Sequence, residues 1–401
     1  MTADKDASEP IDRVLNVERL MDAAVSETGL DDFGPERFRG ALEAYLRTVC
    51  TELNLGANGV VAEQAYAHRL LVNRLRFHRD LREHPEIASE VVSNPIIIVG
   101  LPRTGTTKLQ RVMSLDPSVQ PLILWQALNP APMPATGSDG RDPRIDLAAE
   151  MMGALDAESP DFKAIHTLNP EEPDEDVWLH DFAFEALGSA TRVGSFTLAE
   201  ELGKGDHQRH VYEYEKSLLQ YLQWQNGTNG PWILKSPVHI GNLAPMAEVF
   251  DGATIVHCHR DPHVAIASTL SGLDGLRQML TGCPADDLKA FGEGWLRFWA
   301  AETAKNLNQR RTLAERIRIV DVAYDDIRSN TIGVIEEVYR ACGRSLTPDA
   351  AGLMERWEQQ NPQNKFGSHE YSLDRYGLTD DQVRAAFGDY LDQFGSLVGA
   401  R

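Results

Sequence analysis

The chain has 401 residues, of which 42% are hydrophobic, so it can bury a large core in one α/β unit with helical additions. Its 60 acidic and 39 basic residues give a formal charge of −21, which argues against nucleic acid or an anionic membrane as a partner. An anionic ligand would therefore need a local positive site in this chain.

The lengths of the apolar runs and the spacing of the cysteines indicate in which cellular compartment the protein works. No apolar run reaches the length of a membrane span, and the polar, acidic N-terminal residues show no signal-peptide pattern. The four cysteines are scattered without a C-x-x-C spacing, and no cluster of residues indicates a metal site. We therefore expect a cytoplasmic protein with reduced thiols, no membrane span and no bound metal.

Residues 1–92 are predicted to form a helical extension that precedes an α/β domain at 93–401. Amphipathic patterns begin near Leu15 and continue over 38–53 and 62–83, with a turn between the first two. This region has no chemical motif. We expect a helical cap that packs on the α/β domain or on a partner subunit of a homo-oligomer.

The stretch 94–113 combines a strand, a glycine-rich loop and a helix. Its strand, 96–99, has only β-branched residues, which favours a buried position in a sheet. The loop G-L-P-R-T-G-T-T (100–107) then leads into a helix whose first N–H groups have no partner in the helix. With the Thr106 and Thr107 hydroxyls and the Arg103 guanidinium, this arrangement predicts an anion-binding site.

The spacing of this loop resembles the nucleotide P-loop G-x-x-x-x-G-K-[ST] but differs from it at one position. Gly100 and Gly105 match the two glycines, whereas Thr106 stands where a P-loop has its lysine. A nucleoside triphosphate site needs that lysine on the outer phosphates. The loop therefore keeps the features that cradle a phosphate and lacks the lysine.

After the loop helix, we predict a loop at 121–134 and helices at 142–158 and 197–224. Strands at 232–234, 253–258 and 317–322 then alternate with helices at 240–250, 262 onward, 291–313 and 325–342. This alternation predicts a parallel sheet covered by helices on both faces. Ligands of such sheets bind at the carboxyl ends of the strands, where Arg103, Lys235, Arg260 and Tyr324 follow their strands.

Four motifs together resemble a known family. The P-R-T-G-T-T loop, W-I-L-K-S-P-x-H, H-R-D-P with a serine eight residues after the arginine, and Y-x-D-I occur in the order seen in sulfotransferases that use 3′-phosphoadenosine-5′-phosphosulfate (PAPS). The resemblance is to the bacterial branch and covers roughly residues 94–375. It implies a P-loop-like α/β fold and transfer of a sulfuryl group from PAPS to a hydroxyl or amine, which leaves adenosine 3′,5′-bisphosphate (PAP).

The same resemblance implies roles for individual residues. The loop residues would hold the 5′-phosphosulfate, Arg260 and Ser268 the 3′-phosphate, and Tyr324 would lie near the adenine; Lys365 and His369, in K-F-G-S-H, resemble a late basic loop that closes on the 3′-phosphate. The loop residues in question are Arg103, Thr104, Gly105, Thr106 and Thr107. Lys235 and Arg103 suit stabilisation of the charge that develops on the bridging oxygen, without magnesium.

The acceptor hydroxyl also needs a general base. His166 is our first candidate, because its ordinary pKa suits a base at neutral pH, with Glu171 or Glu172 orienting it. Glu171, Glu172 and Glu175 are alternative bases, since partial burial raises the pKa of a glutamate. A surface histidine beside solvated acids is an equally open interpretation.

The acceptor itself is weakly determined by the sequence. Apolar side chains in two segments could line a pocket for a hydrophobic small molecule, or they could be core: Trp125, Met133, Trp178, Phe182 and Phe184. Two other functions remain alternatives. One is a P-loop small-molecule kinase, which would need ATP and magnesium, and the other is a non-catalytic nucleotide-binding scaffold.

Overall fold

Five parallel strands form one sheet in the computed structural model, which describes residues 11–133, 140–158, 168–361 and 371–399. The strands are β1 (Ile96–Val99), β2 (Gln120–Pro121), β3 (Trp232–Lys235), β4 (Thr254–His259) and β5 (Arg318–Ala323). Their order across the sheet is β2-β3-β1-β4-β5, and every paired neighbour is parallel. The predicted parallel sheet of an α/β fold is confirmed.

Strand β1 is buried on both faces and paired on both edges. Ile97 lies opposite Leu234 of β3 on one side and Ile255 of β4 on the other. Alternate side chains of a strand point to opposite faces, so Ile97 belongs to one hydrophobic cluster and Ile98 to a second. A strand that serves two cores has no solvated face, which explains its unbroken β-branched sequence.

The helices divide into an N-terminal group and a group around the sheet. The first contains α1 (Ile11–Val14), α2 (Val17–Thr28), α3 (Arg37–Glu52), α4 (Ala57–Glu83) and the 3₁₀ helix η1 (Pro85–Ser89). The second contains α5 (Thr106–Met113), α6 (Leu124–Leu128), α7 (Pro143–Glu158), α9 (Val177–His180), η2 (Asp181–Ala183), α10 (Leu187–Val193), α11 (Phe196–Leu202), α12 (His207–Asn226), η3 (Pro237–His239), α13 (Leu243–Val249), α14 (Pro262–Thr281), α15 (Leu288–Leu313), α16 (Tyr324–Ser329), α17 (Thr331–Ala341), α18 (Pro348–Gln360), η4 (Asp374–Tyr376), α19 (Asp380–Ala386) and α20 (Gly388–Val398).

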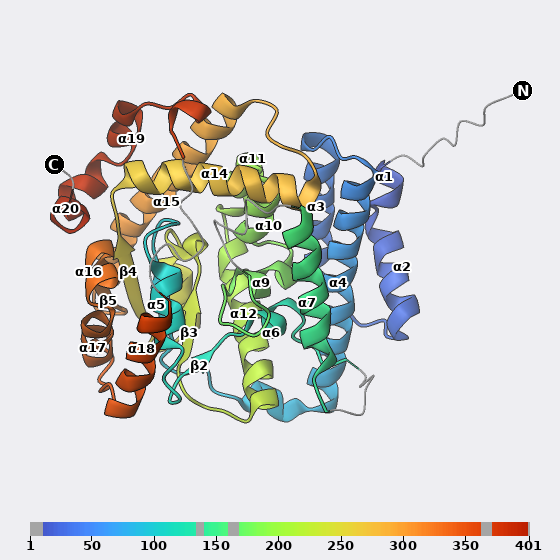
Figure 1. The fold of residues 1–401 in the computed structure, drawn as a ribbon. Helices are drawn as coiled ribbons and strands as arrows, with labels where there is room; N and C mark the ends of the chain where they lie inside the picture. Colours follow the sequence, from blue (N-terminus) through green and yellow to red (C-terminus); the bar gives the residue numbers. More distant parts are fainter. Residues whose placement is uncertain (1–10, 134–139, 159–167, 362–370, 400–401) are drawn as a thin grey trace, which may run out of the picture.

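The two faces of the sheet are covered by different helices. Helices α5, α17 and α18 contribute buried side chains to the cluster that contains Ile96 and Ile98. The larger cluster, which contains Ile97 and Val99, takes side chains from α12, α13 and α15 and extends into α2, α3 and α4. In Figure 1 the blue N-terminal helices lie on the far side of α9–α12 from the orange and red helices α16–α18.

Some predicted helices are divided in the structure. The helix predicted over 197–224 is two helices, α11 and α12, and Gly205 between them has a left-handed φ of +60°. The helix predicted over 325–342 breaks at Asn330, whose side chain accepts a hydrogen bond from the Gly333 N–H and begins α17. The loop predicted at 121–134 contains the short helix α6. A single polar or glycine residue thus ends a helix that the spacing of apolar residues predicts to continue.

Two predicted capping arrangements are present. Asp261 accepts a hydrogen bond from the His263 N–H and starts α14, with Pro262 as its first residue. Thr379 and Gln382 form a reciprocal capping box at the start of α19. No helix in the described part of the chain is long and apolar enough to cross a membrane.

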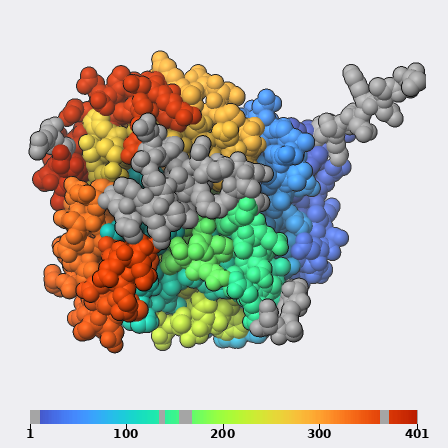
Figure 2. All heavy atoms as spheres, viewed as in Figure 1, coloured from blue at the N-terminus to red at the C-terminus, as the bar shows by residue number. Residues whose placement is uncertain are grey.

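The N-terminal helices share their core with the rest of the molecule. Tyr45 of α3 and Glu63 of α4 both contact Arg192 of α10, and all three side chains are buried. The space-filling view shows green residues between the blue N-terminal helices and the orange C-terminal ones, which together form one continuous surface (Figure 2). The predicted boundary between residues 92 and 93 stays a prediction.

Because the core is continuous, replacing a buried residue of α4 should destabilise the whole protein. Leu70 is 0% exposed, and we expect Leu70→Ala to lower the free energy of unfolding by about 2–5 kcal/mol. Val61 on the same helix is 64% exposed, and Val61→Ala should change it by less than about 0.5 kcal/mol. Urea unfolding measures the free energy of unfolding of both variants. A separate transition at lower urea concentration in Leu70→Ala would contradict the shared core.

Candidate active site

Basic side chains from three neighbouring strands meet at the carboxyl edge of the sheet. The loop at 100–107 follows β1, Lys235 is the last residue of β3, and Arg260 directly follows β4. Since β1 lies between β3 and β4, parallel pairing brings these residues together. A cavity of about 670 Å³ opens here, and Arg103, Thr107 and Arg260 are among its lining residues.

The backbone of the loop turns sharply and leads into α5. Arg103 and Gly105 have φ values of +68° and +86°, and the buried Thr104 hydroxyl donates to the Leu101 carbonyl at 2.7 Å. Gly105 is the N-cap of α5 and supplies no side chain to cap the first turn. The first-turn residues Thr106 and Thr107 line the cavity, so the positive end of α5 meets it, as an anion site requires.

Lys235 connects this loop to the acidic segment that follows residue 170. Its side chain is fully buried, and its ammonium donates to the Thr107 hydroxyl at 3.2 Å and to the Glu175 carboxylate at 2.6 Å. A lysine is rarely buried without a paired partner. The contacts with Thr107 and Glu175 therefore account for the burial of Lys235. Thr107 and Glu175 both line the cavity, with Lys235 directly behind them.

Arg260 contacts the loop at Arg103. Its guanidinium donates to the Arg103 carbonyl at 2.6 Å and lies 4.0 Å from the centre of the Tyr324 ring. Burial lowers the pKa of Arg103, and the nearby positive charge of Arg260 lowers it further. Ser268 of α14 lines the same cavity. A bound anion would offset the concentration of positive charge around Arg103.

The predicted acidic residues have different surroundings. Glu171 pairs with Arg141 and Glu172 with Arg111, and their side chains are 56% and 44% exposed. Glu175 alone of the three glutamates contacts Lys235, and it is 19% exposed. The predicted residues His166, Lys365 and His369 lie outside the described residues.

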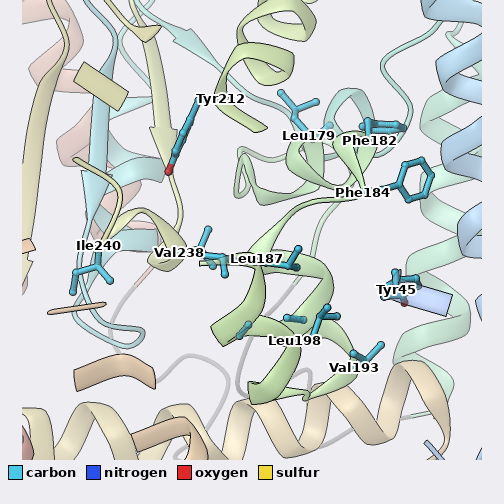
Figure 3. Close-up of a cluster of buried hydrophobic side chains, with 14 of the residues drawn as sticks. Tyr45, Leu179, Phe182, Phe184, Leu187, Val193, Leu198, Tyr212, Val238 and Ile240 are labelled. Carbon is cyan, nitrogen blue, oxygen red and sulfur yellow. The ribbon is translucent and has the colours of Figure 1, made fainter. Parts of the chain in front are cut away.

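One wall of the cavity is apolar. Trp178, among the aromatic residues predicted to line an acceptor pocket, does so, whereas Phe182 and Phe184 are buried in the large hydrophobic cluster (Figure 3). The remaining apolar lining comes from α9, the segment after β3, α14 and α15: Val177, Val238, Leu273, Leu276, Met279, Leu280 and Trp299. The cavity therefore joins a basic, phosphate-cradling end to an apolar one.

A buried polar network behind Glu175 was missed by the sequence analysis. Asp176 accepts from His239 at 2.9 Å, and His239 in turn bonds the Tyr212 hydroxyl at 2.7 Å. Burial alone would raise the pKa of Asp176, but its contact with His239 lowers it. His239 belongs to the motif W-I-L-K-S-P-x-H, which is the signal that could have indicated a partner for it.

Metal-ligand side chains gather at two places in the described chain. They are Asp176 with His180 and His239, and His257 with His259 and Asp321. In each group, histidine and aspartate already bond one another, and Arg310 also pairs with Asp321. Both groups are therefore explained as hydrogen-bonded pairs that tie elements together.

Comparison with known proteins identifies the family. The model of the sulfotransferase family matches residues 95–348, which is more than half of the chain. The chain belongs to the sulfotransferase family. The prediction made from the order of the four motifs is confirmed, and the molecule is an enzyme that transfers a sulfuryl group from a donor to a small-molecule acceptor.

Named relatives and solved structures agree with this assignment. The sulfotransferase is 21% identical over 314 residues, 77% of each chain, to the omega-hydroxy-beta-dihydromenaquinone-9 sulfotransferase Stf3 of Mycobacterium bovis and of Mycobacterium tuberculosis. It is 26% identical to the crystal structure of sulfotransferase STF9 from Mycobacterium avium, with a TM-score of 0.82 over 98% of both chains. STF1 from Mycobacterium tuberculosis H37Rv is also 26% identical, with a TM-score of 0.78 over 93% of this chain and 98% of that one. These neighbours confirm the P-loop-like fold.

The first glycine of the loop should be needed for the sulfotransferase to fold. Gly100 has a φ of +154°, and a β-carbon there would lie 2.6 Å from the Cys258 carbonyl oxygen. We expect Gly100→Ala to lower the free energy of unfolding by about 2 kcal/mol or more. Gly395→Ala is the control, because no atom lies within 4 Å of its added carbon and alanine favours the helix by about 0.5–1 kcal/mol. Equal urea midpoints for the two variants would contradict this steric account.

Proposed function

We propose that this sulfotransferase takes its sulfuryl group from PAPS and transfers it to a hydroxyl of a hydrophobic small molecule. The observation that carries the proposal is the contact of one fully buried lysine, Lys235, with both Thr107 of the phosphate-cradling loop and Glu175 of the acidic segment. This contact supports a role for Lys235 as a cation between a leaving phosphate and a carboxylate that receives the proton of the acceptor.

The donor would occupy the basic end of the cavity. Thr106, Thr107 and the other residues of the loop offer hydroxyl and N–H donors to a 5′-phosphosulfate, and Arg260 with Ser268 would hold the 3′-phosphate. Tyr324, on which the Arg260 guanidinium stacks, would lie beside the adenine. The loop residues meant here are Arg103, Thr104, Gly105, Thr106 and Thr107. Lys365 and His369 remain part of the proposal on sequence grounds.

The reaction moves negative charge, and the chain supplies cations for it. As the sulfur–oxygen bond of a phosphosulfate breaks, the bridging oxygen gains charge, and the phosphate group departs with that bonding pair of electrons. Lys235 and Arg103 would stabilise this charge more strongly than the ground state. Two fixed cations next to a helix N-terminus can supply this stabilisation, so we propose that the reaction proceeds without a metal.

Glu175 is the glutamate best placed to receive the acceptor proton. It lines the cavity and contacts Lys235, whereas Glu171 and Glu172 pair with surface arginines. Neutralising Glu175 would also release Lys235 from its pair just when charge develops on the leaving oxygen. His166, oriented by Glu171 or Glu172, stays the alternative base.

The apolar wall suggests the acceptor class. Tryptophan, leucine and methionine side chains from α9, α14 and α15 favour a hydrophobic body next to Glu175. The printed name of Stf3 assigns that relative a hydroxylated dihydromenaquinone, which is such a molecule. We propose a hydrophobic alcohol for this chain, in a cytoplasmic enzyme that binds no nucleic acid; assembly into a homo-oligomer stays a prediction.

Calorimetric titration with PAP tests the donor. We expect PAP to bind without a metal ion, and to bind equally well with excess EDTA, because the phosphate contacts come from side chains and N–H groups. ATP with magnesium, titrated in parallel, should not bind detectably. Binding of ATP–magnesium without any response to PAP would overturn the proposal in favour of the kinase alternative.

Paired glutamate variants test the base. Glu175→Gln keeps the side-chain shape but cannot accept a proton, so we expect turnover to fall by about 10²–10⁴-fold while PAP affinity is retained. Glu172→Gln is the matched comparison, because Glu172 pairs with Arg111. Rates are measured with labelled PAPS at saturating donor. Loss of turnover in Glu172→Gln with normal rates in Glu175→Gln would favour His166 with its orienting glutamate.

A further inference from the structure

The cavity contains a buried acid that the proposed reaction does not use. Asp181 of η2 lines the cavity and is 4% exposed, and Thr191 and Arg192 of α10 line it beside Asp181. The same cavity contains Glu175, six residues earlier in the chain. Two acids therefore line one cavity, and the proposed reaction uses only Glu175.

Protein contacts use only part of the hydrogen-bonding capacity of Asp181. Two hydroxyls act on its carboxylate: that of Ser189, which donates at the long distance of 3.4 Å, and that of Tyr66, whose interaction lowers the pKa of Asp181. No cation of the described chain lies within ion-pair distance of it. Burial raises the pKa of Asp181, which shows that the protein solvates its charge poorly. An ionised carboxylate can accept about four hydrogen bonds, so a ligand in the cavity has acceptor sites available.

The charges around Asp181 indicate what kind of donor fits. Arg69 and Arg192 act on it from α4 and α10, and Arg192 is paired with the buried Glu63. Two arginines face two carboxylates here, and burial lowers the pKa of the neighbouring His180. A cationic ligand would leave one uncompensated buried charge, whereas a neutral hydroxyl would not.

Apolar side chains line the same cavity as the two acids. Leu273, Leu276 and Met279 of α14 line the cavity that also contains Glu175 and Asp181. Figure 3 shows that Leu187 and Val193 of α10 belong to the neighbouring hydrophobic cluster, with Tyr45 of α3 beside Val193. An apolar surface that shares one cavity with two acids matches a molecule with an apolar body and two polar groups.

On this basis we propose that the acceptor is an amphipathic molecule with two hydroxyl groups: one is sulfated beside Glu175, and the other, neutral and distal, donates a hydrogen bond to Asp181. Asp181 is then a residue that determines specificity and takes no part in bond making. The inference rests on the proposed function and adds the second hydroxyl to it.

A series of straight-chain alcohols from octyl to tetradecyl tests the inference. At each length, the primary alcohol is compared with the diol that has a hydroxyl at both ends and with the corresponding amino alcohol. A hydrogen bond to a buried carboxylate contributes about one order of magnitude in affinity or more, so we expect KM for the best diol to be about tenfold lower than for its mono-alcohol. The amino alcohol should gain no such advantage.

Variants of Asp181 assign the preference to this residue. Asp181→Leu should abolish the ratio of diol to mono-alcohol KM, and Asp181→Asn, which preserves shape, should reduce it. This ratio does not depend on how much of the enzyme is folded. Asp274→Asn is the control: Asp274 is also a 4% exposed acid, but it pairs with Arg375 and does not line the cavity, so the preference should persist.

Several results would overturn the inference. They are equal KM values for diol and mono-alcohol in the unaltered enzyme, a preference that survives in both Asp181 variants, or a preference for the amino alcohol. Failure to sulfate any alcohol of the series while PAP still binds would also overturn it and leave the proposed donor intact. Failure to bind PAP would instead count against the proposed function.

Discussion

Hydrogen bonding of β1 to a parallel strand on each side determines where the loop after β1, Lys235 and Arg260 lie. Because β3 and β4 flank β1 in register, the residues that follow the three strands must share one edge of the sheet. The loop of β1, Lys235 and Arg260 are far apart in the chain and have no other reason to meet. The helices contribute walls to the cavity, while the strand order sets its chemistry.

An acidic protein can bind an anionic ligand here because positive charge is concentrated at the site. A chain with a formal charge of −21 repels a phosphate at long range, but screening confines that repulsion to about 10 Å at ordinary ionic strength. Within that range, Arg103 and Arg260 lie next to a helix N-terminus, and Lys235 is held by one carboxylate. The net charge of the protein therefore does not decide whether the site binds an anion, because only charges within about 10 Å of the ligand act on it strongly.

The fold was predictable where the signal is local. The β-branched run of β1, the capping box at Thr379 and the N-cap Asp261 each specify structure within a few residues, and all are present. The break at Asn330 was missed because the buried residues Ile327, Val334 and Val338 on its two sides keep one helical phase. The break at Gly205 was missed because the apolar spacing was followed through two glycines, Gly203 and Gly205. Anion-site residues could be predicted because strand ends in a parallel sheet share an edge.

The distinction among the glutamates could not be made from the sequence. Glu171, Glu172 and Glu175 lie within five positions and have the same chemistry, and they differ only in their partners Arg141, Arg111 and Lys235. Asp181 gave no signal for the same reason: its surroundings depend on α4 and α10, which only the tertiary fold brings together. Buried polar contacts between distant segments have no periodicity to detect.

The strand order also has a consequence for biosynthesis. β1 spans Ile96–Val99, but its partners β3 and β4 begin only at Trp232 and Thr254, so the ribosome must make the intervening helices before the sheet can form around it. During that interval, a wholly apolar segment is without its pairing strands, a state that favours aggregation in newly made chains. The N-terminal helices are made before it, and they share a hydrophobic cluster with Ile97 and Val99, so partners for one face of the strand already exist when the strand is made.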